Sequence, residues 1–304
     1  MTGELAKRWG VASVGIPAVL ALTYMGGWYL AVPLAGFAAW GAHEVFRFSA
    51  RKGVRAVEPI GITGSAALVL LAAWRPSFVE LAPWALGVLA MGSLLAMLAA
   101  LRGRGPDDEP LSAVAVTLFG MVYVGLALSF VPLVHALPAA RGWSGAAGAA
   151  SGMGALGGAV GGLVVVALPL ATTWIGDAAA FFAGSAWGAG RRRLAPRISP
   201  NKTWVGFWAA LSGAAVAAFS WALVARAVLP GANHDLALLV VAGAALGLAA
   251  VVGDLAESLL KRGAGVKDSG TFFPGHGGVL DRIDSLIFTF PTAYVALVLL
   301  DVAR

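Results

Sequence analysis

Two groups of acidic and hydroxyl residues flank a glycine-rich, basic segment late in the chain. The first group has the spacing i, i+3, i+4 and i+7, which places its members on one face of a helix; they are Asp254, Glu257, Ser258 and Lys261. The second group repeats i, i+3 and i+4 with Asp281, Asp284 and Ser285. Hard carboxylate oxygens favour Mg²⁺, which often completes its octahedron with phosphate oxygens. The pattern therefore predicts a divalent cation bound together with a phosphorylated substrate, and four nearby acids are compatible with a second cation.

The segment between the two groups supplies positive charge and glycine. Its basic residues would offset the charge of a phosphate, and they are Lys261, Arg262, Lys267 and Arg282. Its glycines would let backbone N–H groups approach that phosphate. His276 lies in a Gly-His-Gly-Gly turn without a partner His or Cys, which favours phosphate binding or loop shaping over metal ligation. Helix caps or surface ion pairs would explain any one of these residues, but they explain the whole set poorly.

A second segment, from Trp174 to Gly206, combines an acid with a basic loop. Asp177 falls near the end of an apolar stretch, and a run of arginines follows. The loop ends in Ser199, Lys202 and Thr203, just before the next apolar stretch. Free N–H groups and the dipole at a helix N-terminus favour an anion, so this loop is a second candidate phosphate site. The arginines have an alternative interpretation as a topology anchor.

The composition indicates whether the protein is soluble or embedded in a membrane. The chain has 304 residues, of which 59% are hydrophobic and 12% charged, and the mean hydropathy is +0.84. A soluble domain carries roughly 25% charged residues. The same numbers argue against disordered chains, and the absence of cysteine excludes disulfide scaffolds, thiolate catalysis and Cys-type zinc sites. An all-α, polytopic integral membrane protein is expected.

Nine apolar stretches are candidate membrane spans, since a crossing helix needs roughly 20 apolar residues. They are Val11–Met25, Trp28–Val45, Ile60–Trp74, Val79–Leu101, Leu111–Val134, Leu156–Ile175, Val205–Val224, Leu236–Val252 and Leu286–Val302. With the N-terminus in the cytoplasm, all but four of the 21 Lys and Arg residues fall on the cytoplasmic side. The exceptions are Arg75, Arg141, Arg226 and Arg304.

The net charge of +6 is therefore attributed to the basic residues that orient the spans in the membrane. These residues also make the cytoplasmic face suited to anionic lipids or phosphates. Nucleic-acid binding is disfavoured because the charges sit in short loops. The chain is expected to divide into N-terminal spans, residues 1–140, and a catalytic membrane region, residues 141–304, with cytoplasmic loops at 188–203 and 262–282. Faces of small residues are compatible with a homodimer.

The late segment resembles a known signature. Ser258-Leu-Leu-Lys261-Arg262, then Lys267-Asp268-Ser-Gly, then Pro274-Gly-His-Gly-Gly-Val-Leu-Asp281-Arg282-Ile-Asp284 is similar to the motif of phosphatidate cytidylyltransferases, also called CDP-diacylglycerol synthases. Ile198 to Gly206 resembles that family's second motif, although Val205 stands where the family usually has Glu. The resemblance is specific over roughly residues 174–285.

The resemblance implies a reaction in which CTP and phosphatidic acid give CDP-diacylglycerol and pyrophosphate, with Mg²⁺, at the cytoplasmic side of the plasma membrane. It implies metal ligation by Asp254 and Asp281, with Asp177 and Asp284 as second choices. Catalytic roles are expected for Asp254, Asp281, Asp284 and Lys267. Substrate binding is expected for Ser199, Lys202, Thr203, Ser258, Lys261, Arg262, His276 and Arg282.

Two other functions stay open at this point. A CTP-dependent polyprenol or lipid kinase would use similar acids but transfer the γ-phosphoryl group, giving CDP and a phosphorylated alcohol. A transporter would use intramembrane acids for coupling, but such proteins usually carry an internal repeat and broken helices at the midplane. No repeat is visible here, which makes the transporter the weaker alternative.

Overall fold

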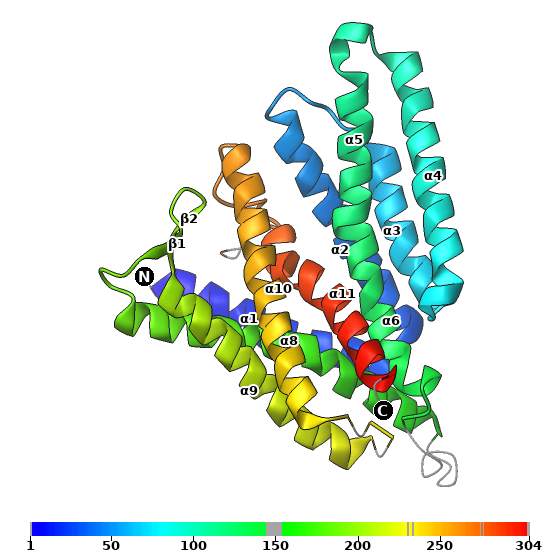
Figure 1. Ribbon diagram of the computed structural model, residues 1–304. Coiled ribbons are helices and arrows are strands. Elements are labelled where there is room, and N and C mark those ends of the chain that lie inside the picture. The colour runs from blue at the N-terminus through cyan, green and yellow to red at the C-terminus, as the bar shows by residue number, and fades with distance from the viewer. Residues whose placement is uncertain are drawn as a thin grey trace. The chain divides into compact units, whose positions relative to one another are not determined.

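The structure is a computed structural model that describes residues 2–143, 154–229, 231–232, 234–273, 275 and 277–302. Within these residues the chain is almost entirely helical (Figure 1). The helices are α1 (Thr2–Met25), α2 (Gly27–Ala50), α3 (Glu58–Trp74), α4 (Phe78–Gly103), α5 (Pro110–Gly120), α6 (Ala127–Ala140), α8 (Gly154–Trp187), α9 (Trp204–Val228), α10 (Leu236–Gly263) and α11 (Leu280–Val302). A 3₁₀ turn, η1 (Pro106–Asp108), precedes α5, and a π-helical turn, η2 (Met121–Leu126), joins α5 to α6.

Each of the nine apolar stretches in the sequence forms helix in the described residues. Six helical segments are long and apolar enough to cross a membrane: Phe78–Gly103, Pro110–Ala140, Gly158–Trp187, Trp204–Val228, Leu236–Gly263 and Leu280–Val302. The chain is therefore an all-α membrane protein. The helix of the sixth stretch continues to Trp187, and α11 begins at Leu280, so both run beyond the predicted spans.

The loop between α8 and α9 contains structure that the sequence analysis did not predict. Strand β1 (Arg193–Ala195) pairs antiparallel with β2 (Ser199–Thr203), with Arg193 opposite Thr203 and Ala195 opposite Ser199. The main-chain N–H of Trp204 donates to Arg192 O over 3.2 Å, which ties the hairpin to the start of α9. The basic loop is thus a hairpin with a defined register.

The described chain forms two compact units, and α10 and α11 each contribute residues to both. Unit 1 consists of Met1–Leu133 and Leu260–Ile283, and unit 2 of Val134–Leu259 and Asp284–Arg304. In unit 1, the buried ring of Phe46 in α2 lies between Gly61 of α3 and Gly120 of α5. A Cβ on either glycine would come within 2.6 Å of a ring carbon, so neither position has room for a side chain. This wedge fixes α2 beside α3 and α5.

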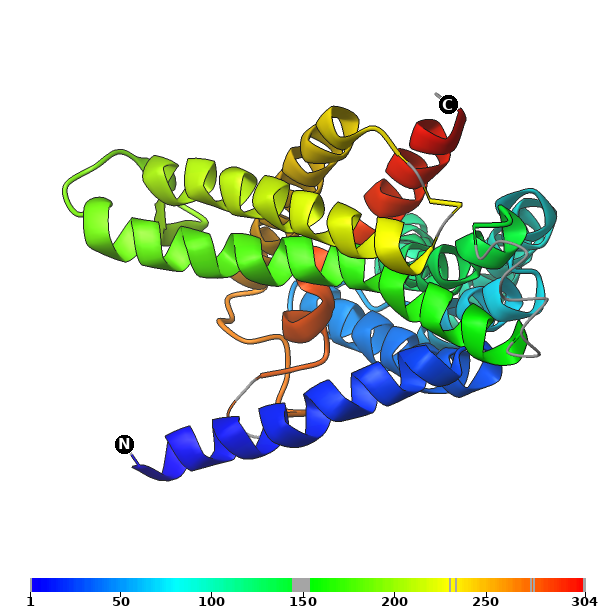
Figure 2. The same cartoon turned by 90° about the horizontal axis from the view of Figure 1, so that it is seen from below.

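In unit 2, α8 and α9 lie side by side along much of their length (Figure 2). Small residues make this approach close: a Cβ on Gly213 of α9 would lie 2.8 Å from the Cβ of Ala179 in α8. Helix α9 also meets α10, where a Cβ on Gly247 would lie 2.8 Å from the Cβ of Ala214. The packing of small residues against one another is typical of membrane helices. It holds α8 and α10, which carry Asp177 and Asp254, close to α9.

Candidate active site

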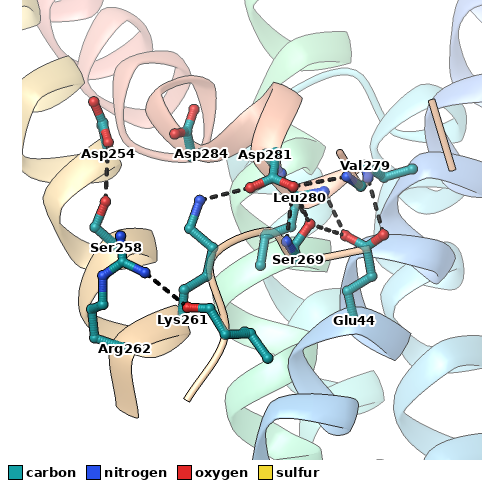
Figure 3. A network of polar contacts seen from close by, with 12 residues as sticks. Glu44, Asp254, Ser258, Lys261, Arg262, Ser269, Val279, Leu280, Asp281 and Asp284 are labelled. Atoms are coloured by element: carbon teal, nitrogen blue, oxygen red, sulfur yellow. Dashed lines mark hydrogen bonds and ion pairs between the residues drawn. The ribbon is translucent and has the colours of Figure 1, made fainter. Parts of the chain in front are cut away.

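In unit 1 the Asp281 side chain is the centre of a hydrogen-bond network at the start of α11 (Figure 3). Its Oδ1 accepts a hydrogen bond from Lys261 Nζ at 2.6 Å. Its Oδ2 accepts hydrogen bonds from the backbone N–H groups of Ser269 and Gly278, both at 2.8 Å, and lies 3.0 Å from Ser269 Oγ. The side chain is only 8% exposed. Asp281 is therefore held in one orientation by donors from the glycine-rich segment and from α10.

Glu44 of α2 binds the same segment and is 1% exposed. Its two carboxylate oxygens accept hydrogen bonds from the backbone N–H of Val279 at 3.1 Å and of Leu280 at 2.8 Å. The hydroxyl of Ser269 lies 2.7 Å from Glu44 Oε2 and so stands between the two carboxylates of Glu44 and Asp281. Figure 3 shows the two acids on opposite sides of this serine.

The glycines of the segment make room for these carboxylates. A Cβ on Gly278 would lie 2.6 Å from Glu44 Cδ, and one on Gly270 would lie 3.1 Å from the same atom. Gly277 has a positive φ of 80° beside the Asp281 carboxylate, a conformation that favours glycine. The sequence predicts that the glycines make room for a phosphate. In the structure, Gly270, Gly277 and Gly278 make room for acids of the protein itself.

Unit 2 contains a second group of charged residues. Lys202 of β2 forms an ion pair with Asp254 Oδ2 of α10, and Ser258 Oγ donates to Asp254 Oδ1 over 3.3 Å. Asp177 of α8 interacts electrostatically with both Asp254 and Lys202. The i, i+4 spacing of Asp254 and Ser258 thus brings their side chains together, as the sequence predicts. The Asp254 side chain is 36% exposed, in contrast to the enclosed Asp281.

Thr203 has a defined structural contact in the same unit. Its Oγ1 accepts a hydrogen bond of 3.1 Å from the N–H of Gly206 and so caps α9. One of the first-turn donors that a phosphate would use is therefore already bound. Ser199 lies at the start of β2, opposite Ala195, and is half-buried.

The remaining predicted residues lie around these groups. Asp284 Oδ1 accepts from the N–H of Ser285 at 2.6 Å. Arg262 donates to the carbonyl of Val266 at 3.0 Å, and Lys267 and Arg282 are exposed. His276 lies outside the described residues.

The chemistry of both groups is that of a carboxylate facing an ammonium. Asp281 faces Lys261 in unit 1, and Asp254 faces Lys202 in unit 2. No three His, Asp or Glu side chains in the described part of the chain come together as a ready-made metal cage. Such an arrangement supplies one or two hard anionic oxygens and a cation for phosphate, rather than a site enclosed by protein ligands.

Sequence reasoning missed Glu44 and Ser269. Glu44 stands at the end of the second apolar stretch, outside the two segments from which the site was predicted. The sequence signal for Glu44 was its position: it follows Trp40 and His43 and precedes Phe46 on a largely apolar helix. No pattern within residues 254–285 could reveal a partner more than 200 positions earlier.

Comparison with known proteins gives a consistent result. The sequence model of the cytidylyltransferase family matches residues 6–300 of this chain. A phosphatidate cytidylyltransferase from Synechocystis sp. is 31% identical over 300 residues, which cover 95% of this chain and 95% of the relative.

Other relatives match the C-terminal part more strongly but over a shorter range. Phosphatidate cytidylyltransferases from Haemophilus influenzae and Brucella suis are 41% and 42% identical over 130 and 134 residues. These matches cover 43% and 44% of this chain. The chain thus spans slightly less than half the length of these two relatives, 44% and 47% respectively.

Proposed function

Because the chain belongs to the cytidylyltransferase family, we propose that it transfers the CMP group of CTP to phosphatidic acid, giving CDP-diacylglycerol and pyrophosphate. The family resemblance expected from the signature is thereby confirmed. The activity, the substrates and the residue roles below are our proposal.

The observation that carries the proposal is the pairing of each principal acid with a lysine. Lys261 lies 2.6 Å from Asp281, and Lys202 pairs with Asp254. Paired in this way, the acids are oriented, and each lysine is positioned beside a point where anionic phosphate oxygens would arrive. A nucleotidyltransferase needs this combination because both of its substrates are phosphates.

The donor set fits Mg²⁺, since oxygen ligands in small number match its preference for one or two carboxylates plus phosphate oxygens. Asp254 and Asp281 are each proposed as a ligand of a divalent cation, with Asp177 and Asp284 as further candidates and a second cation as part of the proposal. When bound, Mg²⁺ would neutralise charge on the reacting phosphate groups.

The protein's own residues supply position and charge. In the reaction, a phosphate oxygen of phosphatidic acid bonds to the α-phosphorus of CTP, and the bond to the pyrophosphate oxygen breaks. Lys202 and Lys261, with Lys267, Arg262 and Arg282, would bind phosphate oxygens of the substrates. A general base is unnecessary because a phosphate monoester is already ionised near neutral pH.

The proposal includes the topology expected from the sequence. Nine spans with a cytoplasmic N-terminus would place the hairpin and the segment of residues 262–282 at the cytoplasmic face of the plasma membrane. Phosphatidic acid would then enter from the bilayer while CTP arrives from water. Homodimerisation stays a prediction.

The test is a pyrophosphate-release assay on detergent-purified protein with Mg²⁺, CTP and phosphatidic acid, each omitted in turn. We expect pyrophosphate and a CMP-containing lipid only when all three are present. Production of CDP and a phosphorylated alcohol from CTP and a lipid alcohol would instead identify a lipid kinase.

The assay has a matched second arm because Val205 replaces the family's usual Glu. If folded wild-type protein releases no pyrophosphate, Val205→Glu is assayed in parallel. Activity restored by that substitution would show a cytidylyltransferase site inactivated at one position, and silence in both proteins would overturn the proposal.

A further inference from the structure

We propose that Glu44 is a positioning residue for Asp281: it fixes the segment between Ser269 and Asp281, and thereby the carboxylate that the reaction uses. The inference rests on the proposed function for its catalytic consequence. Glu44 itself is buried and bonded on both oxygens, so it has no direct part in the chemistry.

Within the described residues, the hydrogen bonds of Glu44 all end on the segment that carries Asp281. Two donors are the N–H groups of Val279 and Leu280, at 3.1 and 2.8 Å. These groups stand at the N-terminus of α11, where backbone N–H groups lack helical partners and a negative charge is favoured. Glu44 therefore acts as a helix cap from a distant part of the sequence, and it sets where α11 begins.

The third contact links Glu44 to Asp281 through one atom. Ser269 Oγ lies 2.7 Å from Glu44 Oε2 and 3.0 Å from Asp281 Oδ2, and the N–H of Asp281 donates to it over 3.3 Å. A displacement of Glu44 would release this hydroxyl and the two N–H groups together. Asp281 would keep its lysine, but the segment whose donors orient its second oxygen would no longer be anchored by Glu44.

The position of Glu44 is itself firmly set. Phe46, two residues later in α2, is wedged between Gly61 and Gly120 in a space with no room for added atoms. The loop glycines Gly270 and Gly278 leave a gap that the Glu44 carboxylate fills. The loop is thus shaped around a carboxylate at this place, which a merely stabilising apolar contact would not require.

Glu44→Gln tests the proposal with little change in volume. The amide places an NH₂ group where one carboxylate oxygen accepted a backbone hydrogen bond, so two donors face each other. Loss of a group that orients a metal-binding carboxylate typically costs 10–100-fold in metal affinity or activity. We expect kcat to fall about tenfold or more and the Mg²⁺ concentration for half-maximal rate to rise about tenfold.

Three further variants separate the positioning role of Glu44 from an effect on overall stability. Ser269→Ala leaves the two backbone contacts of Glu44 in place and removes only the link to Asp281, and we expect the same direction of change in Mg²⁺ dependence. The double variant should lose little more than the stronger single one, because both act through one link. Glu58→Gln is the matched control: Glu58 is also an acid of unit 1, but it contacts His43 at 2.9 Å and is 40% exposed.

Amide hydrogen exchange of residues 266–284, without Mg²⁺ or substrates, gives a readout independent of activity. We expect faster exchange in Glu44→Gln and in Ser269→Ala, but not in Glu58→Gln. If neither the wild-type protein nor Val205→Glu formed a CDP-lipid, the proposed function would be rejected, and the exchange data would still test the anchoring of the segment by Glu44. Unchanged kcat, Mg²⁺ dependence and exchange in both Glu44→Gln and Ser269→Ala would overturn the inference, even if Glu44→Gln melted at a lower temperature.

Discussion

Lys261 Nζ lies 2.6 Å from Asp281 Oδ1, and this contact joins the last turn of α10 to the first turn of α11 within unit 1. The other carboxylate oxygen is bound by the backbone N–H groups of Ser269 and Gly278. The two oxygens of Asp281 therefore have different surroundings. Oδ2 accepts hydrogen bonds from the backbone, and Oδ1 faces the ammonium group of Lys261.

The first prediction concerns this carboxylate. Asp281→Asn keeps the shape of the side chain but removes its charge, and we expect CDP-diacylglycerol formation to fall at least about 100-fold, as when a charge-stabilising group is lost from an active site. The measurement is pyrophosphate release at saturating substrates. Asp107→Asn, in an exposed turn, serves as the control and should retain wild-type rates; full activity in Asp281→Ala would sink the assignment.

The hairpin lysine should matter more than its neighbours. Lys202→Ala removes the partner of Asp254 and a candidate phosphate ligand, so we expect kcat/KM for CTP to drop at least about tenfold. Arg197→Ala removes an equal charge from the exposed turn of the same hairpin and should change kcat/KM less than about twofold. Equal losses in the two variants would mean that the hairpin acts only through its overall charge.

Thr203 gives a prediction about stability. Thr203→Ala removes the side-chain cap of α9, which typically costs about 1 kcal/mol. Thr203→Ser retains the capping oxygen and should recover most of that loss. Thermal unfolding in detergent measures both variants, and an alanine variant as stable as the serine variant would contradict the capping role.

The glycines predict a steric effect on the same site. Gly278→Ala would push a methyl group to within 2.6 Å of Glu44 Cδ, so we expect activity to fall with the same rise in Mg²⁺ requirement as in Glu44→Gln. The control is Gly263→Ala at the end of α10, where a Cβ would meet no atom within 4 Å. The prediction fails if both alanines are tolerated equally.

The absence of cysteine allows a direct test of topology. Arg197→Cys and Ala140→Cys each introduce a single thiol at an exposed position. The nine-span topology predicts that a membrane-impermeant maleimide labels Ala140→Cys in intact cells or spheroplasts, and Arg197→Cys only after permeabilisation. Labelling of both from the same side would require a different number of crossings.

The sequence predicted the helices well because the apolar stretches are long and their chemistry is unambiguous. Every stretch became a helix, including the short one at Glu58–Trp74. The helix ends were less predictable: α8 reaches Trp187 through small and aromatic residues that carry no stop signal. The hairpin was missed because its strands are short, basic and contain Pro200, which argues against a strand by composition.

For the candidate site, local spacing found the pairs that lie on one helix but not the partners from elsewhere. Asp254 and Ser258 were expected together and are in contact. Lys202 and Asp254 both appeared in the predicted set, yet nothing in the sequence paired them. Glu44 was out of reach because a contact between α2 and α11 depends on how α2 packs through Phe46, which is a tertiary property.

The close contacts of α9 with α8 and α10 depend on small residues, and these positions do not tolerate substitution by larger residues. At Gly213, Gly243 and Gly247 an added Cβ would lie within 2.8 Å of an atom of a neighbouring helix, so any larger residue must separate the helices. Natural variation at these positions should therefore stay among the smallest residues, and random mutagenesis should recover far fewer functional variants here than on the lipid-facing sides of the same helices.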